Sequence, residues 1–245
     1  MIRSLSGAMG SIGFDEEALR SGAASIRHPI TRALLALTFT TGLVDAVSYL
    51  ALGRVFTANM TGNVVLLGFG IAGSGGLPVT APLVSLAAFL LGAGLGGVLV
   101  RRRGGHLLAL VAAGLGLEAS LLGLAAILAA AIDVHPGRAS GFVLVALMAC
   151  AMGARSAVVR RLAVPDLSTT VLTMTLTSLA AEAAPAGGSG KGTVRRLSAV
   201  VAMLVGAVCG ALLLKTSTAI PLALAAGLAL ATWLVYVPAA ARPGR

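Results

Sequence analysis

The chain alternates between long apolar runs and short polar segments. About twenty consecutive apolar residues cross the hydrocarbon core of a bilayer, and six runs have that length: roughly 31–53, 79–100, 106–131, 139–160, 195–215 and 217–238. Two further runs, at 59–73 and 166–184, are short or rich in threonine and follow the first and fourth long runs. The pattern predicts an all-α, polytopic membrane helix bundle with six spans and two short re-entrant or half helices.

The composition favours a membrane protein over a soluble one. Hydrophobic residues make up 58% of the chain and charged residues 11%, whereas about a quarter of the residues in globular domains are charged. We expect a flexible polar N-terminal tail over 1–30, a single transmembrane domain over 31–238 and a C-terminal tail over 239–245. The N-terminal tail lacks an apolar run followed by a small-residue cleavage site, so we do not interpret it as a signal peptide.

The basic residues predict an orientation. A formal charge of +10 would suggest a nucleic-acid partner in a soluble protein, but here the basic residues flank apolar runs, so we expect no nucleic acid. With a cytoplasmic N-terminus and neither short run crossing, fourteen of the 18 lysines and arginines are cytoplasmic; if both short runs cross, ten are. The first arrangement fits the positive-inside rule. It predicts a protein of the bacterial cytoplasmic (inner) membrane with both termini in the cytoplasm.

Short matches recur along the chain at offsets of 111 to 114 residues, and such self-similarity indicates an internal duplication. The predicted halves are about 31–131 and 139–238. Because each half holds three spans, the second half enters the membrane from the opposite side. This inverted repeat is the plan of many secondary transporters, whose binding site lies near the midplane where short, interrupted segments meet. The matched positions are Gly42 and Ala46 with Gly153 and Ala157, Thr61 with Thr173, Gly92 and Gly96 with Gly206 and Gly210, and Gly114 with Gly227.

Three blocks of sequence carry a resemblance: VDAVSYL, FTANMTGN and VVRRLAVPDLSTT. Together they resemble the YoaK family of bacterial multi-pass membrane proteins, a domain of unknown function, and the likeness extends from about Thr31 to the last span. The resemblance implies a membrane protein of unassigned activity, so it supports the fold class and adds little about mechanism. At Arg155 this chain departs from the Gln-like polar residue that the family pattern implies.

Three ionisable residues, Asp45, Glu118 and Arg155, lie inside predicted spans. Such groups are expensive at membrane depth and are by default a hypothesis about function. Asp45 would carry a proton, hold a cation or pair with Arg155; alternatively, it is a structural carboxylate that accepts hydrogen bonds from the polar turn after its span. Glu118 stands where the other half has Ala231, and pairing with Arg155 would explain it as well as a function would.

The first short segment carries Asn59, Thr61 and Asn63 at alternate positions. Residues two apart do not share a helical face, so we expect them to line a turn or an unwound entry to the helix. Thr57 or Asn59 is a candidate N-cap, and capping alone is the alternative role.

The second short segment presents Thr169, Thr173 and Thr177 at helical spacing on one face. A threonine stripe of this kind either lines a polar pathway or joins helices by hydrogen bonds. Both interpretations stay open.

No motif supports an enzyme. The sequence contains no GxSxG, HExxH, CxxC or Walker pattern, so we expect no enzymatic activity, no cofactor and no metal site. Cys150 and Cys209 lie within apolar runs and are interpreted as packing residues.

The leading hypothesis is a secondary transporter or channel-like carrier of a small solute, in which the short polar segments form a midplane site and Asp45 is the coupling or gating carboxylate. The expected partners are the lipid bilayer and an unknown small solute, and a homo-oligomer is open. The alternatives are a non-transporting membrane scaffold or sensor and an intramembrane enzyme that uses Asp45 and Glu118.

Overall fold

The computed structural model describes residues 29–103, 107–162, 172–182 and 192–240, and within these ranges the chain forms helices and turns but no strand. Each of the six long predicted runs corresponds to one helix whose ends differ from the prediction by no more than three residues. The helical assignment is therefore confirmed for the described residues, whereas the predicted tails lie mostly outside them. The helices are α2 (Pro29–Ala51), α3 (Met60–Ile71), α4 (Thr80–Arg103), α5 (Leu107–Ala131), α6 (Ala139–Leu162), α7 (Leu172–Ala181), α8 (Thr193–Leu213) and α9 (Ala219–Ala240).

Helix length distinguishes long elements from short ones. Among the described residues, five helices (α2, α4, α5, α6 and α8) are long and apolar enough to cross a membrane. α9 has 22 residues, but its stretch Ala219–Val235 belongs with the shorter apolar helices, so the sixth span stays a prediction. α3 has 12 residues and α7 has 10. At 1.5 Å per residue they are about 18 and about 15 Å long, too short by themselves for a hydrocarbon core of roughly 30 Å.

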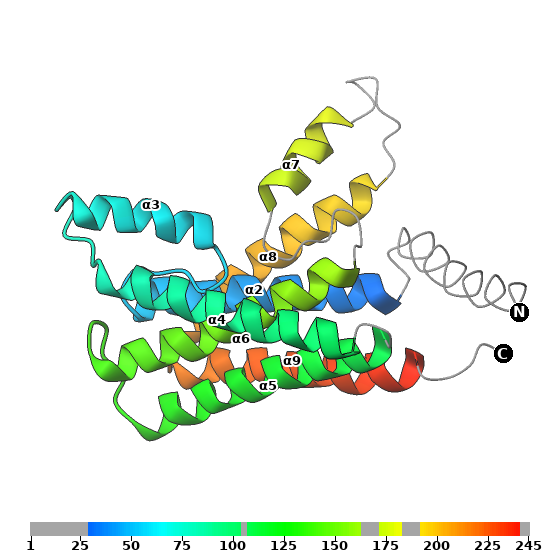
Figure 1. Cartoon of the computed structure of the whole chain (residues 1–245). Coiled ribbons are helices and arrows are strands. Elements are labelled where there is room, and N and C mark those ends of the chain that lie inside the picture. The colour runs from blue at the N-terminus through cyan, green and yellow to red at the C-terminus, as the bar shows by residue number, and fades with distance from the viewer. Residues whose placement is uncertain (1–28, 104–106, 163–171, 183–191, 241–245) are drawn as a thin grey trace, which may run out of the picture.

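The helices pack in pairs that join the two halves of the chain (Figure 1). α2 packs along α8, α4 along α6 and α5 along α9. α5 also contacts α6, α2 also contacts α9, and the short helices α3 and α7 pack on α4 and α8. The long helices of one half therefore find their main partners in the other half.

Four glycines allow the paired helices to approach closely. A Cβ atom at any of them would lie 2.0 or 2.1 Å from a backbone carbonyl oxygen of the facing helix, far inside an ordinary contact distance of about 3.5 Å. Small residues of this kind let helix backbones touch in membranes. The contacts are Gly42 with Met203 and Gly206 with Phe39 between α2 and α8, and Gly92 with Cys150 and Gly153 with Phe89 between α4 and α6.

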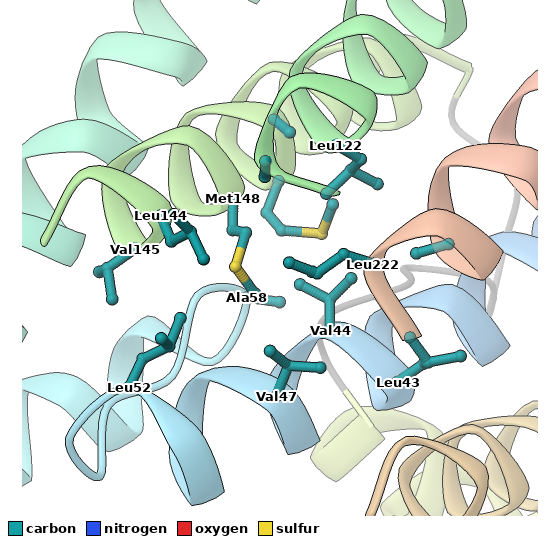
Figure 2. Packing of buried hydrophobic residues seen from close by; sticks show 14 of the residues in the cluster. Leu43, Val44, Val47, Leu52, Ala58, Leu122, Leu144, Val145, Met148 and Leu222 are labelled. Carbon is teal, nitrogen blue, oxygen red and sulfur yellow. The ribbon is translucent and has the colours of Figure 1, made fainter. Parts of the chain in front are cut away.

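The main apolar core lies between α2, α5, α6 and the first turns of α9 (Figure 2). Its fully buried side chains include Val44, Val47, Leu122, Met148 and Leu222. In lipid, helices associate through van der Waals packing rather than through exclusion of water. The fit of these side chains therefore holds the centre of the bundle together.

The chain doubles back between α2 and α4. Positive φ values of 105° at Gly53 and 56° at Arg54 turn the backbone just after α2, and a positive φ is uncommon for a residue other than glycine. The irregular segment 55–59 then returns alongside α2, and α3 leads outward again. α3 consequently lies at the end of the bundle where α2 ends and α4 begins (Figure 1).

Candidate functional site

Asp45 ties the irregular segment before α3 to α2. Its side chain is 6% exposed. Oδ1 accepts hydrogen bonds from the backbone N–H groups of Thr57 and Ala58, each at 2.9 Å, and from the Thr57 hydroxyl at 3.4 Å. These contacts match the alternative role of Asp45 as a structural carboxylate. It accepts from two backbone N–H groups of an irregular segment, which have no partner within a helix. The other oxygen, Oδ2, is buried and has no hydrogen-bond partner among the described residues.

Asn63 holds the same segment from the side of α3. Its Oδ1 accepts from the backbone N–H of Phe56 at 2.9 Å, and its Nδ2 donates to the carbonyl of Phe56 at 2.7 Å. Nδ2 also lies 3.1 Å from the hydroxyl oxygen of Ser85, which itself donates to the Phe56 carbonyl at 2.6 Å. Both backbone groups of Phe56 are thus bonded, and α3 is joined to α4.

The predicted placement of the polar stripe in a turn is wrong for Thr61 and Asn63, which both lie in the first turn of α3. Asn59 is the N-cap, as one prediction had it, and its Oδ1 accepts from the N–H of Gly62 at 3.2 Å. Residues two apart point to different sides of a helix, and the two side chains accordingly have different surroundings. Asn63 is directed into the interior, whereas Thr61 is exposed.

A cleft of about 470 Å³ lies at the start of α3. It brings together Thr61 and Thr173, which are matched positions of the proposed duplication and come from the two short helices. The residues described as lining it carry no charge. They are Phe56, Asn59, Thr61, Gly62, Val65, Leu66 and Thr173.

The threonine stripe of α7 is only partly at this cleft. Thr173 and Thr177 are exposed, and the Thr177 hydroxyl donates to the Thr173 carbonyl at 2.9 Å. The buried residue of the helix is Thr175, which lies on another face. Thr169 lies outside the described residues.

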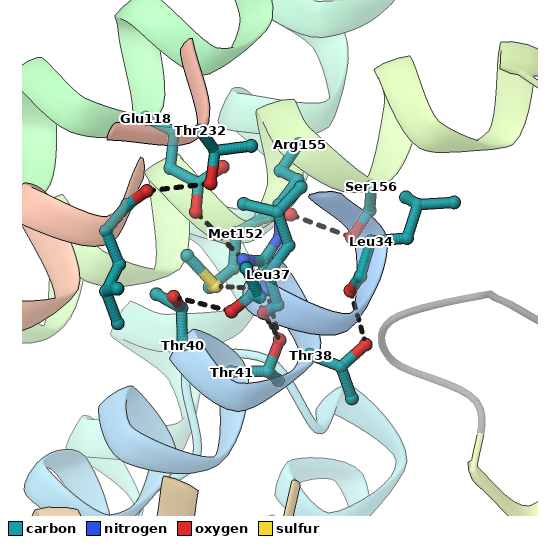
Figure 3. A network of polar contacts seen from close by, with 12 residues as sticks. Leu34, Leu37, Thr38, Thr40, Thr41, Glu118, Met152, Arg155, Ser156 and Thr232 are labelled. Atoms are coloured by element: carbon teal, nitrogen blue, oxygen red, sulfur yellow. Dashed lines mark hydrogen bonds and ion pairs between the residues drawn. The ribbon is translucent and has the colours of Figure 1, made fainter. Parts of the chain in front are cut away.

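Arg155 is the centre of a second polar cluster, between α2, α5 and α6 (Figure 3). Arg155 is 2% exposed and its ion-pair partner Glu118 is 0% exposed. The guanidinium Nη1 donates to Glu118 Oε1 at 2.8 Å and to the Leu37 carbonyl at 3.1 Å. Nη2 donates to the Thr41 hydroxyl and lies 3.0 Å from the Met152 sulfur. Of the two carboxylates considered as partners for Arg155, the described ion pair uses Glu118.

A cavity of about 30 Å³ adjoins this ion pair, and Glu118 and Arg155 both line it. Glu118 Oε2 and Arg155 Nε are buried and lack a hydrogen-bond partner in the described part of the chain. Apart from these two side chains, the described lining of the cavity is apolar. Asp45 lines neither this cavity nor the cleft at α3, as far as their described lining residues show. The structure therefore does not bring Asp45 and Glu118 to one cleft.

Two members of these clusters were not predicted, Thr41 and Ser85. Each is a hydroxyl residue inside an otherwise apolar span, and that is the only signal the sequence offers for them. Such residues are frequent in membrane helices, where many bond their own helix backbone, so the signal is weak. Thr41 accepts from Arg155 of α6, and Ser85 bonds Phe56 and Asn63. The sequence pattern does not reveal these distant partners.

Residues 33–235 match the family described as protein of unknown function, DUF1275. The chain is also similar to the UPF0700 transmembrane protein YoaK of Bacillus subtilis (strain 168), with 39% identity over 147 residues that cover 58% of this chain and 62% of that protein. The matched part is thus less than two thirds of the relative's length. No solved structure matches the chain. The family match includes at least part of every long helix, in agreement with the resemblance drawn from the sequence blocks, and the chain belongs to the DUF1275 family as a YoaK-like integral membrane protein.

Proposed function

We propose that this chain is a membrane carrier for a small solute, a secondary transporter or channel-like carrier, built from two inverted repeats with six crossing helices. The re-entrant path of segment 52–71, which leaves and returns at one end of the bundle, supports the assignment of α3 as a helix that does not cross. The distribution of basic residues then supports an inner-membrane location with cytoplasmic termini.

The glycine contacts support the repeat. A Cβ at Gly42 would lie 2.1 Å from the carbonyl oxygen of Met203 and 2.9 Å from the nitrogen of Ala207. A Cβ at Gly153 would lie 2.1 Å from the carbonyl oxygen of Phe89 and 2.9 Å from the nitrogen of Ala93. The two glycines are 111 residues apart and their partners 114, the offsets found in the sequence.

The pairing of the helices also supports the inverted repeat. If α2 corresponds to α6, α3 to α7, α4 to α8 and α5 to α9, then the α2–α8 pair becomes the α6–α4 pair. The α5–α6 contact likewise becomes the α9–α2 contact, and α3 on α4 becomes α7 on α8. One two-fold operation that exchanges the halves leaves this contact pattern unchanged, as inverted repeats require.

The observation that carries the functional proposal is the cleft shared by Thr61 and Thr173. In inverted-repeat carriers the short broken helices of the two halves form the binding site, and here their matched threonines line one space. Asp45 is the coupling or gating carboxylate in this proposal, because it holds the segment that carries Phe56 and Asn59, which form part of the wall of the cleft.

A specific observation favours a second candidate, a non-transporting scaffold or sensor. Asp45 Oδ1 accepts three hydrogen bonds, and the amide of Asn63 is bonded at both ends. Such contacts serve packing as well as they serve transport. Access of water to the cleft distinguishes the two functions, since only a carrier needs it.

Thiol accessibility tests the proposal. In a variant without Cys150 and Cys209, single cysteines at Thr61 and Thr173 should react with a membrane-impermeant, charged thiol reagent. A matched cysteine at Val64, on the exposed apolar face of α3, should not, because it faces lipid. Absence of reaction at both cleft positions from either side of the membrane would favour the scaffold.

A transport assay tests the role of Asp45. Proteoliposomes are screened with a panel of labelled neutral and charged small solutes, and Asp45→Asn is then compared with the unaltered protein. Asparagine keeps an oxygen for the N–H groups of Thr57 and Ala58, so the fold should persist while uptake is lost. Normal uptake by Asp45→Asn would refute the coupling role.

A further inference from the structure

Three buried charged side chains lie on α2, α5 and α6, and α6 contacts the other two helices. Asp45 on α2, Glu118 on α5 and Arg155 on α6 are 6%, 0% and 2% exposed. The cluster therefore holds two carboxyl groups and one guanidinium. If both carboxyls were ionised, it would bury one net negative charge.

A buried charge without a partner is costly, and the usual remedy is neutralisation. The contacts around the cluster show where neutralisation is possible. One oxygen of each carboxyl, Asp45 Oδ2 and Glu118 Oε2, is buried and without a hydrogen-bond partner in the described ranges. A single proton on either oxygen would make the cluster neutral.

The face of α2 that Arg155 contacts continues to Asp45. The guanidinium bonds the carbonyl of Leu37 and the hydroxyl of Thr41, one turn further along. Asp45 is the next residue at that four-residue spacing, about 6 Å beyond Thr41 along the helix axis. A long, flexible arginine side chain can therefore serve either carboxyl from one backbone position.

The cavity beside Glu118 identifies the cation that this carboxyl can take. Apart from Glu118 and Arg155, its described lining side chains are apolar: Ala33, Leu34, Leu37, Val111, Gly114, Leu115, Val158 and Val159. A metal cation such as Ca²⁺ needs six or more oxygen ligands, which these side chains do not supply, and the guanidinium repels it. A proton needs a single oxygen, and Glu118 Oε2 is available for it.

We propose that Arg155 is a two-position switch between Glu118 and Asp45, set by one proton that resides on whichever carboxyl the guanidinium has left. In the described position, Arg155 pairs with Glu118 and the proton belongs to Asp45. When Glu118 takes a proton from a hydronium ion of the solvent, which leaves water, and Asp45 gives its proton to solvent water, which becomes hydronium, the guanidinium moves to Asp45. The total charge of the cluster is the same in both positions. The switch deepens the proposed carrier function. Its use in transport rests on that function, whereas the movement of Arg155 does not.

The other charged groups of the packed helices stand apart from this cluster. α5 carries no charged residue besides Glu118, and α3 and α9 carry none. Of the further titratable groups, Tyr49 stacks on Phe56, and Cys150 lies where α6 contacts Gly92 of α4. The remaining charged residues of α2, α4, α6 and α8 are near the helix ends in the sequence: Arg32, Arg101, Arg102, Arg103, Arg160, Arg161, Arg195 and Arg196.

The chain contains a natural reporter for the switch. Trp233 is its single tryptophan, and its indole N–H donates to the Ala112 carbonyl at 2.8 Å. It packs against the cluster that includes Leu34, Leu37 and Val111, residues that also line the cavity. Movement of Arg155 along α2 should therefore change the surroundings of the indole.

The first experiment follows tryptophan emission of the purified protein in lipid nanodiscs from about pH 5 to about pH 9, the range in which buried carboxyls titrate. The unaltered protein should show a titration step. Glu118→Gln should abolish it, whereas Glu182→Gln should retain it, because Glu182 is 50% exposed and pairs with Arg196 elsewhere. A step that survives in Glu118→Gln would overturn the proposal.

The second experiment measures thermal unfolding of Glu118→Gln, Asp45→Asn and the double variant. Each single variant leaves Arg155 one carboxyl, so each should keep the fold. The double variant leaves none, and its melting temperature should fall by about 5 °C or more beyond the sum of the single decreases. Adding Arg155→Met to the double variant should restore stability, because no buried charge remains. Additive decreases in melting temperature, or no recovery of stability with Arg155→Met, would overturn the switch. Neither experiment measures transport, so a negative result here does not decide the carrier proposal.

Discussion

The closest helix contacts make a sharp prediction about stability. Gly42→Ala places a Cβ that would start 2.1 Å from the carbonyl oxygen of Met203. An ordinary contact needs about 3.5 Å, so α2 and α8 must separate locally by about 1.4 Å. Both atoms at this contact belong to helix backbones, and neither can rotate away. The helices must therefore move, which disturbs packing along the pair.

The size of the effect follows from two opposing terms. Overpacking of a close contact costs about 1–3 kcal/mol, and alanine in place of a helical glycine returns about 0.5–1 kcal/mol through lower conformational entropy. The net loss is at most about 2.5 kcal/mol, or a decrease of up to roughly 10 °C in melting temperature for a chain of this length. Gly153→Ala should cause a similar decrease, because its Cβ would also lie 2.1 Å from a carbonyl oxygen.

Purified protein in detergent is heated in steps, and the fraction that stays monodisperse is measured by size-exclusion chromatography. Gly94→Ala is the matched control, since a Cβ there has no neighbouring atom within 4 Å in the described part of the chain. It should melt at or above the temperature of the unaltered protein. If Gly42→Ala behaves like Gly94→Ala, α2 and α8 do not touch as described. If Gly42→Ala and Gly153→Ala differ widely, the two contacts are not equivalent.

Three further outcomes are expected. Asn63→Ala should lower stability by about 1–3 kcal/mol, because the N–H group of Phe56 loses its partner while the carbonyl of Phe56 keeps the Ser85 hydroxyl. Ser85→Ala should cost about 1 kcal/mol, because that carbonyl keeps the Asn63 amide; thermal unfolding measures both. Cysteine at Ser74 should react with an impermeant reagent in intact cells and cysteine at Ser189 only after permeabilisation; the same sidedness at both positions would contradict a first half with an odd number of crossings. Trp233→Phe should cost about 0.5–1.5 kcal/mol through the lost hydrogen bond to α5, and an unchanged melting temperature would exclude that bond.

The sequence was sufficient for the helices because lipid leaves the backbone few choices. A long apolar run without water must satisfy its own N–H and C=O groups, and the helix does so within the run. The run lengths therefore gave the helix ends within three residues. The offsets between matched positions also pointed to Gly42, Gly92, Gly153 and Gly206, which lie at the closest contacts between helices.

The partner of Arg155 could not be predicted in the same way. Glu118 and Asp45 were both candidates, and the choice depends on how α5 and α6 are rotated about their axes. A helix that is apolar on every side has no distinct buried face in its sequence, so hydropathy does not encode that rotation. The same holds for α7, where regular spacing placed Thr173 and Thr177 on one face but did not reveal that Thr175 is the buried residue.

The crosswise pairing of helices has a consequence for biogenesis. When the ribosome has delivered α2, α4 and α5, the surfaces that will receive α8, α6 and α9 still have no occupant. The nascent protein must wait in the membrane, with its glycine faces open, until translation is nearly complete. A fragment that stops after α5 would therefore be a target for quality control, whereas two separately synthesised fragments, cut between α5 and α6, would each supply what the other lacks.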